Sequence, residues 1–262
     1  MGSSRYLASF VALIAIFASF KFYNDPAVTE ITMSGPEMKI FESDEVLKHV
    51  KRMQAVATPE RPALPSDRGA WAMAWLHLVI WNSWKGAYYY ADKFPKEDFA
   101  NYADYAWSAV EFLEGHHDAE EQALFPALEK KFPGSMEKNE AQHESFLKPV
   151  DKILLPVMEH LADELDTLKG SELLKHFTED ELASLNQLTH KAQRGDNHKN
   201  LPFILRAGVS NLPPNSPFPP APAFVTKGLG PWVFYWKYSS LWKYATYPWK
   251  PTLPTAVPET SL

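Results

Sequence analysis

Residues 111–129 read EFLEGHHDAEEQALFPALE, in which two histidines precede two glutamates by four residues. Residues four apart share a helix face, so His116 pairs with Glu120 and His117 pairs with Glu121. An imidazole nitrogen and a carboxylate oxygen one turn apart can bind the same cation, and such ligands suit iron, manganese or zinc. Hydrophobic residues extend both faces, so periodicity leaves both registers open. The alternative interpretation is a solvated, charged helix face.

Three further histidines lie inside long apolar segments. They are His77 in AWLHLVIW, His143 in EAQHESFL and His190 in NQLTHKAQ. A lone buried histidine most simply bonds a carbonyl, and an unpartnered one costs on the order of 1 to 3 kcal/mol. Four inward histidines together with Glu120 are harder to explain by packing alone. They indicate a metal site in the core of a helical bundle.

Helical patterns account for the segments that carry these residues. Ser43 can cap a short amphipathic helix, SDEVLKHVKRMQAVA. Four long helices follow, and no period-2 strand pattern competes with them. We expect these helices at residues 70–91, 96–124 and 136–168, the last bent at its prolines, and from a capping box at Thr178 and Glu181 onward. Short links favour antiparallel neighbours, which predicts an all-α, up-down-up-down four-helix bundle.

The ends of the chain differ from this central region. Leu7 to Phe20 is an uninterrupted apolar run, so residues 6–23 are predicted to be a membrane anchor or a cleaved signal that directs the chain to the secretory pathway. Twelve of the 22 prolines fall from Pro202 onward, before an aromatic-rich end. We expect its rings to pack back on the bundle, with a membrane-interface layer as the alternative. The predicted division is 1–23 signal or anchor, 24–66 spacer with a short helix, 67–200 bundle and 201–262 Pro/Trp/Tyr-rich extension.

Composition excludes several classes of function. The 262 residues have a formal net charge of -6 and contain no basic cluster, so a nucleic-acid partner is not expected. The chain contains no cysteine, which excludes disulfides and thiolate metal ligands. Any metal must therefore be held by nitrogen and oxygen atoms.

The histidine and glutamate pattern resembles the hemerythrin-like, HHE cation-binding family, and the C-terminal NLPFIL and FVTKGLGPWVFYW resemble its fungal members. The family is a four-helix bundle with His on the first helix, HxxxE on the second, His on the third and HxxxE on the fourth. These residues usually surround a non-haem di-iron centre. In this family the second motif is commonly followed by L-F-P, and Leu124-Phe125-Pro126 then selects His116 and Glu120.

The resemblance implies a specific set of metal ligands. They are His77, His116, Glu120 as the bridging carboxylate, His143 and His190. One position departs from the family pattern, because Arg194 stands four residues after His190 where a second carboxylate is expected. Either Asp196 or His198 replaces it, or the site holds one metal instead of two. His117 and Glu121 are expected to support the ligands or face solvent, and His160 is expected on the surface.

The resemblance also implies the cofactor and the kinds of function to consider. We expect non-haem iron that binds dioxygen or another small molecule. An oxygen-dependent oxidoreductase, with the aromatic residues of the first helix lining a substrate pocket, is the alternative. A membrane-tethered interaction module with a vestigial site is a further alternative.

Overall fold

The computed structural model of the chain describes residues 38–143 and 150–192, with a few residues of the C-terminal region. Those C-terminal residues are Phe203, Ile204, Phe224, Val233, Lys237, Tyr238 and 243–245. The predicted anchor at residues 6–23 and most of the predicted extension lie outside the described residues. Within the described part of the chain, no helix combines the length and the apolar character needed to span a membrane.

Every regular element in the described residues is helical. The long helices are α2 (Asp44–Val56), α3 (Pro65–Tyr90), α4 (Phe99–Ala119), α7 (Val150–Thr167) and α9 (Glu179–Ala192). The shorter elements are two 3-10 turns (Met38–Ile40 and Lys96–Asp98), a π-helical turn (Glu120–Leu124), α5 (Phe125–Glu129), α6 (Glu137–His143) and α8 (Gly170–Leu173). The predicted all-α bundle is confirmed.

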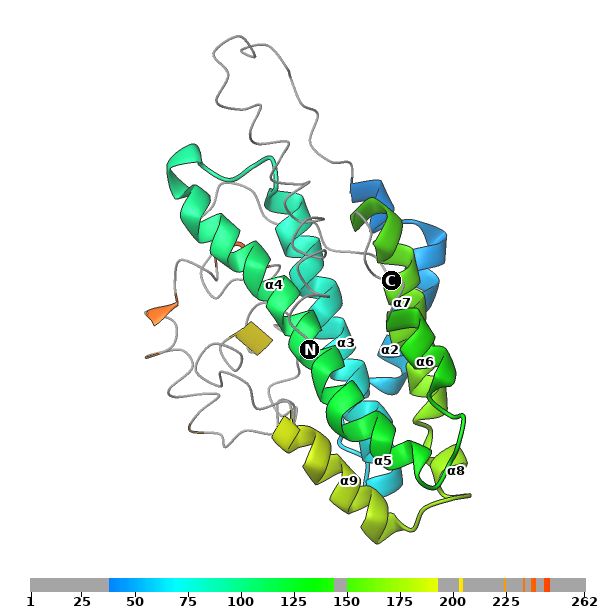
Figure 1. The fold of residues 1–262 in the computed structure, drawn as a ribbon. Coiled ribbons are helices and arrows are strands. Elements are labelled where there is room, and N and C mark those ends of the chain that lie inside the picture. The colour runs from blue at the N-terminus through cyan, green and yellow to red at the C-terminus, as the bar shows by residue number, and fades with distance from the viewer. Residues whose placement is uncertain are drawn as a thin grey trace.

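Helix α3 lies at the centre of the arrangement. It packs against α4, α7, α2 and α9, and α2 also runs along α7 (Figure 1). Helix α6 lies beside α7, so the chain segments with candidate metal ligands surround one region next to α3. A continuous hydrophobic core joins all of the long helices.

Helix α2, expected within a spacer, belongs to this core. Ser43 caps it as predicted, because its side chain accepts a hydrogen bond from the backbone N–H of Val46. On its outer edge Arg52 forms an ion pair of 2.7 Å with Asp163 of α7. Three of its side chains are buried: Val46, Val50 and Met53. The helix therefore covers the side of α3 and α7 that α4 leaves open.

The second predicted helix changes geometry at Glu120. The N–H of Phe125 bonds the carbonyl of Glu120, five residues earlier, which is the π-helical pattern. Pro126 has no N–H for the carbonyl of Gln122, and a wider turn at this point avoids the loss of a regular helical bond. The segment ends at Gly134, whose φ of 80° suits glycine best.

The third predicted helix, 136–168, is wrong as a single element. The structure has α6 and α7 in its place, and the residues between them, which include Pro149, lie outside the described part. The helix that follows has the predicted capping box. The N–H of Glu181 bonds the Thr178 hydroxyl, and the N–H of Thr178 bonds the Glu181 carboxylate.

Tyr244, from the predicted C-terminal extension, packs into the bundle. It is fully buried, and its ring lies 5.4 Å from that of Tyr90 and 5.4 Å from that of Tyr102. Its hydroxyl donates to Asp98, which also pairs with Lys243. This residue agrees with the expectation that aromatic rings of the extension pack on the bundle. The domain boundaries themselves stay a prediction.

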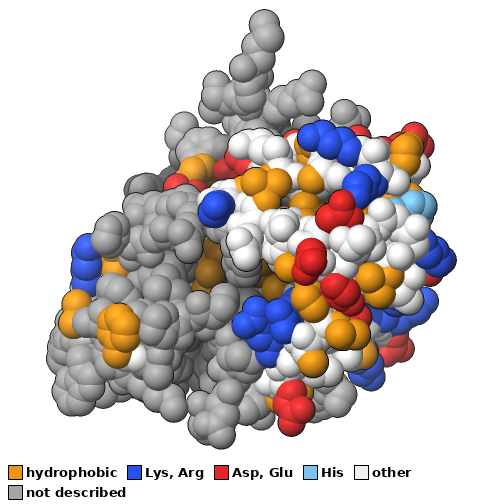
Figure 2. Space-filling view, turned by 90° about the horizontal axis from the view of Figure 1, so that it is seen from below, with side chains coloured by type: hydrophobic (Ala, Val, Ile, Leu, Met, Phe, Trp, Pro, Cys, Tyr) orange, Lys and Arg blue, Asp and Glu red, His pale blue; other side chains and the backbone are white. Residues whose placement is uncertain are grey.

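The face seen in Figure 2 shows how charge is distributed over one end of the molecule. Acidic and basic side chains are interspersed with hydrophobic ones over its described part. Such mixing matches a sequence without a basic cluster, and the absence of a nucleic-acid partner stays a prediction.

Candidate metal centre

Two groups of side chains that could hold a metal lie side by side in the bundle. The inner position consists of His77, His116, Glu120 and Glu164. The outer position consists of His117, Glu120, His143 and His160. In each group the four possible ligand atoms lie within 4.8 Å of one another. Glu120, at the start of the π-helical turn, belongs to both positions.

At the inner position, nitrogen and oxygen atoms from α3, α4 and α7 converge. The Nε2 atoms of His77 and His116 are 3.1 Å apart. Nε2 of His77 lies 3.3 Å from Oε2 of Glu164, and Nε2 of His116 lies 2.9 Å from Oε1 of Glu120. The four residues thus present two imidazoles and two carboxylates to one point.

A hydrogen bond at Nδ1 fixes the orientation of the His77 ring. Nδ1 lies 2.7 Å from the carbonyl oxygen of Leu161. A carbonyl only accepts, so Nδ1 carries the proton and donates it. The lone pair of a neutral His77 is therefore on Nε2, which faces the inner position, as metal-binding histidines require.

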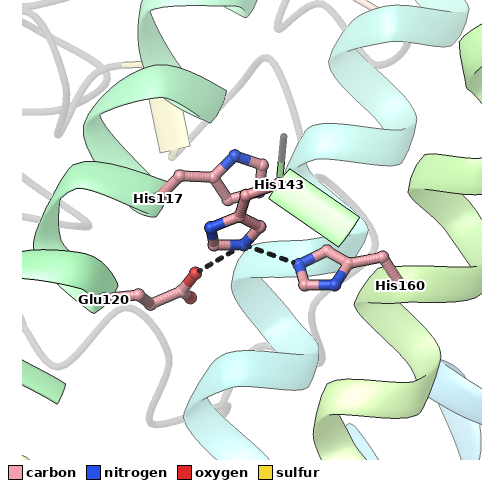
Figure 3. Close-up of side chains that lie close together, drawn as sticks. All are labelled: His117, Glu120, His143 and His160. Atoms are coloured by element: carbon pink, nitrogen blue, oxygen red, sulfur yellow. Dashed lines mark hydrogen bonds and ion pairs between the residues drawn. The ribbon is translucent and has the colours of Figure 1, made fainter. Parts of the chain in front are cut away.

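At the outer position, nitrogen atoms of three imidazoles lie close to one another and to an oxygen of Glu120 (Figure 3). Nε2 of His143, from the end of α6, lies 2.9 Å from Nε2 of His160 and 3.7 Å from Oε2 of Glu120. The ring of His117 stacks on that of His143 with centroids 4.0 Å apart. This set offers three nitrogens and one oxygen.

The outer histidines have polar partners behind them. Nδ1 of His143 lies 3.0 Å from Oε1 of Glu121, and Nδ1 of His160 lies 3.1 Å from Oε1 of Gln142. Both partners accept hydrogen bonds, which directs the two Nε2 atoms toward the outer position.

Comparison with known proteins identifies the type of domain. A family model described as the hemerythrin HHE cation-binding domain matches residues 88–187. Residues 88–187 are hemerythrin-like. No curated protein and no solved structure matches the chain significantly. The matched residues of the hemerythrin-like domain include α4 through most of α9, whereas His77 and all of α2 precede them.

Burial makes the histidines of the hemerythrin-like domain poor bases. Desolvation lowers the pKa of His116 to about 4. Desolvation, reinforced by neighbouring imidazoles, lowers the pKa of His77, His117 and His160 well below the ordinary value. These imidazoles are therefore neutral near pH 7, which is the state that binds metals.

The carboxylates show the opposite shift for the same reason. Desolvation, followed by the nearby charge of Glu164, raises the pKa of Glu120 well above its ordinary value. Desolvation also raises the pKa of Glu164, although His116 and His143 oppose the rise. Both side chains are completely buried.

The polar atoms at this centre fit a cation better than they fit each other. Within the described residues, neither oxygen of Glu120 or of Glu164 has a hydrogen-bond donor, and Nδ1 of His116 has no hydrogen-bond partner. The contacts of these oxygens are with imidazole nitrogens. The acceptors at Nδ1 of His77 and His143 leave lone pairs on the Nε2 atoms that lie near Glu164 and Glu120. Close acceptor atoms repel each other unless a proton or a cation lies between them. A metal ion at each position would compensate the buried charge of both carboxylates.

The structure brings together four of the five residues predicted as ligands: His77, His116, Glu120 and His143. The side chain of the fifth, His190, lies outside the described residues, although its backbone belongs to α9. The replacements considered for Arg194, which were Asp196 and His198, also lie outside them. A metal-ligand role for any of the five stays a prediction.

Three residues of the centre were missed or misplaced. His160 was expected on the surface, but it is 0% exposed. His117 is buried, which excludes the solvent-facing alternative for this residue. Glu164 was not considered. The signal for it was present, since HLADE from His160 to Glu164 repeats the HxxxE spacing of His116 and Glu120. With this second motif in α7, the second carboxylate no longer has to come from the region of Arg194.

Proposed function

We propose that the hemerythrin-like domain binds two transition-metal ions that share Glu120, that the metal is iron, and that the centre binds dioxygen. The observation that supports this most directly is the set of four buried carboxylate oxygens, on Glu120 and Glu164, that have no hydrogen-bond donor among the residues the structure describes. Burial of an uncompensated carboxylate costs several kcal/mol, so a chain that places two in its core needs a compensating cation.

The ligand types favour iron among the possible metals. The inner position offers two imidazoles and two carboxylates, and the set of two His and one carboxylate with open positions is typical of non-haem iron(II). The absence of cysteine removes the thiolate ligands that favour structural zinc or clusters. Four protein ligand atoms at each position leave room for a small molecule.

Hydrogen bonds and burial prepare the histidines of the centre to bind a metal. The carbonyl of Leu161 holds His77 in one tautomer, and Glu121 does the same for His143. The buried ligands keep bulk water away from the inner position, which strengthens electrostatic interactions there. A bound iron pair would supply the redox chemistry that dioxygen binding needs.

The oxidoreductase alternative has less support. In that alternative the aromatic residues of the first helix line part of a substrate pocket: Trp71, Trp75, Trp81, Trp84 and Tyr88 to Tyr90. Three of these tryptophans pack in the core instead. Trp71 and Trp84 are buried and donate their indole N–H groups to the carbonyls of Thr58 and Ala109. Trp81 is 3% exposed and packs against Phe41. These residues serve core packing, so binding without turnover is the better proposal.

Metal content and an optical spectrum of the purified protein test this proposal. We expect about two irons per chain and a visible absorption that appears in air and is lost on anaerobic reduction. Replacement of Glu120 by alanine should remove most of the metal, because it belongs to both positions. His176→Ala, which changes an exposed histidine far from the centre, should leave the metal content unchanged.

The outcomes separate the parts of the proposal. Less than about a tenth of an equivalent of any transition metal in the wild-type protein would exclude a metal centre. Two equivalents of a metal other than iron would exclude iron and dioxygen but keep the two positions. Equal loss in Glu120→Ala and His176→Ala would show that metal binds elsewhere.

A further inference from the structure

The two metal positions differ in how deeply they lie. Every residue of the inner position is buried, and His77, Glu120 and Glu164 are 0% exposed. His77 and Glu164 lie within α3 and α7, the helices that carry much of the core. An inner ligand can move away only if these helices separate, which costs free energy close to that of global unfolding.

The outer position depends on a ligand that is easier to displace. His143 is the last residue of α6, a helix of seven residues. Its side chain is 5% exposed, whereas the side chains of His77, Glu120 and Glu164 are 0% exposed. The opening of a short peripheral helix disrupts few buried contacts and therefore occurs at lower free energy than separation of long core helices.

Glu121 connects His143 to solvent. Its side chain is 44% exposed, and its Oε1 atom lies 3.0 Å from Nδ1 of His143. The corresponding partner of the inner His77 is the carbonyl of Leu161, in a buried hydrogen bond. Solvent is thus one hydrogen bond away from an outer ligand and has no such route through His77.

We infer that the outer metal exchanges before the inner metal, and that Glu121 is the positioning residue that sets the rate of this exchange. The inference rests on the proposed two-metal function. Glu121 accepts the Nδ1 proton of His143, which keeps the Nε2 lone pair directed at the outer position. Its negative charge also makes that nitrogen a stronger ligand.

The loss of Glu121 acts on one position only. Without the acceptor, the His143 ring can rotate or change tautomer, and the outer position then retains His117, Glu120 and His160. The inner position keeps all of its ligands, and the hydrogen bond that orients His77 is unaffected. A change in the release of only one of the two metals is therefore the signature of this role.

Iron release to a chelator measures the effect directly. The full chain is loaded anaerobically with iron(II), mixed with an excess of a coloured iron(II) chelator, and followed by absorbance. We expect two phases of equal amplitude in the wild-type protein. Glu121→Ala should accelerate the fast phase about 10-fold or more, the scale on which such partners affect metal affinity, and leave the slow phase unchanged.

Two variants show whether the hydrogen bond is responsible. Glu121→Gln keeps an acceptor oxygen but loses the charge, so the fast phase should accelerate less than in Glu121→Ala. Glu140→Ala removes an exposed carboxylate from α6, one turn before His143, and should leave both phases as in the wild type. His143→Ala should bind about one iron, which is released in the slow phase alone.

Failure of this inference can be distinguished from failure of the proposed function. Two bound irons that leave in a single phase, equal acceleration of both phases by Glu121→Ala, or the same effect from Glu140→Ala would overturn the inference while the metal centre stands. A wild-type protein that takes up no iron would overturn both. Retention of two irons by His143→Ala would overturn the assignment of the outer position.

Discussion

The substitution Glu164→Gln should change stability in opposite directions with and without metal. In the metal-free protein both carboxylate oxygens of Glu164 are buried, and no side chain or backbone group in the described part of the chain donates a hydrogen bond to them. Glutamine has nearly the same size and no charge, so it removes the cost of burying a carboxylate. In the metal-loaded protein the same change removes a strong ligand of the inner position.

The expected size of the effect follows from these two terms. Relief of an uncompensated buried carboxylate, less the cost of an unsatisfied amide, should stabilise the metal-free protein by about 1 to 3 kcal/mol. For a domain of this size that corresponds to a rise in Tm of about 2 to 12 °C. A ligand present at about 100 times its Kd stabilises by roughly 2.7 kcal/mol, and the variant should lose much of that gain.

Thermal unfolding with chelator and with added iron(II) under anaerobic conditions provides the assay. Glu159→Gln is the matched control, because it makes the same chemical change at an exposed position of α7 next to His160. It should leave both Tm values within about 1 °C, as surface substitutions usually do. A fall in the Tm of metal-free Glu164→Gln would refute the reasoning, since it would mean that the carboxylate stabilises the fold by itself.

Three further predictions concern the rest of the molecule. Met53→Ala should destabilise the protein by about 2 to 5 kcal/mol in urea unfolding, because this side chain is 0% exposed in the core. A loss of stability below about 1 kcal/mol would mean that α2 does not pack against the core in solution. Tyr244→Phe removes the hydrogen bond to Asp98 and should cost about 0.5 to 1.5 kcal/mol in the same assay, whereas no change would contradict the docking of this residue. Burial lowers the pKa of His116 from 6.5 to about 4. Between these pH values the unfolded chain binds more protons than the folded chain, so the metal-free protein should lose stability as the pH falls from 6.5 through about 4. Tm values measured against pH in the presence of chelator test this, and His116→Gln should weaken the pH dependence.

The bundle could be predicted from the sequence because its signals are local. The Ser43 cap, the Thr178 and Glu181 capping box and the apolar helical segments each depend on residues close together in the chain. The packing of α2 could not be predicted in the same way. Its amphipathic pattern shows that one face is buried, but the pattern does not show that α3 and α7 cover it.

The surface position predicted for His160 is wrong, and the predicted helix over 136–168 is incompatible with its observed place beside His143. His143 and His160 are 17 residues apart, and on a continuous helix they would point about 100° apart. A single helix over 136–168 therefore cannot direct both histidines at one site. The break between α6 and α7 removes this restriction, and the two Nε2 atoms lie 2.9 Å apart.

The adjacent histidines of HHDAEE are explained best by two metals. Neighbouring residues on a helix point about 100° apart, so His116 and His117 are poorly placed to bind one ion. In the structure His116 faces the inner position and His117 faces the outer position, while Glu120 reaches both. A one-metal centre would leave one of these buried imidazoles without a ligand role, whereas a centre that shares Glu120 uses both. Alanine substitution of either histidine should therefore reduce metal content, and loss from only one of them would favour a single metal.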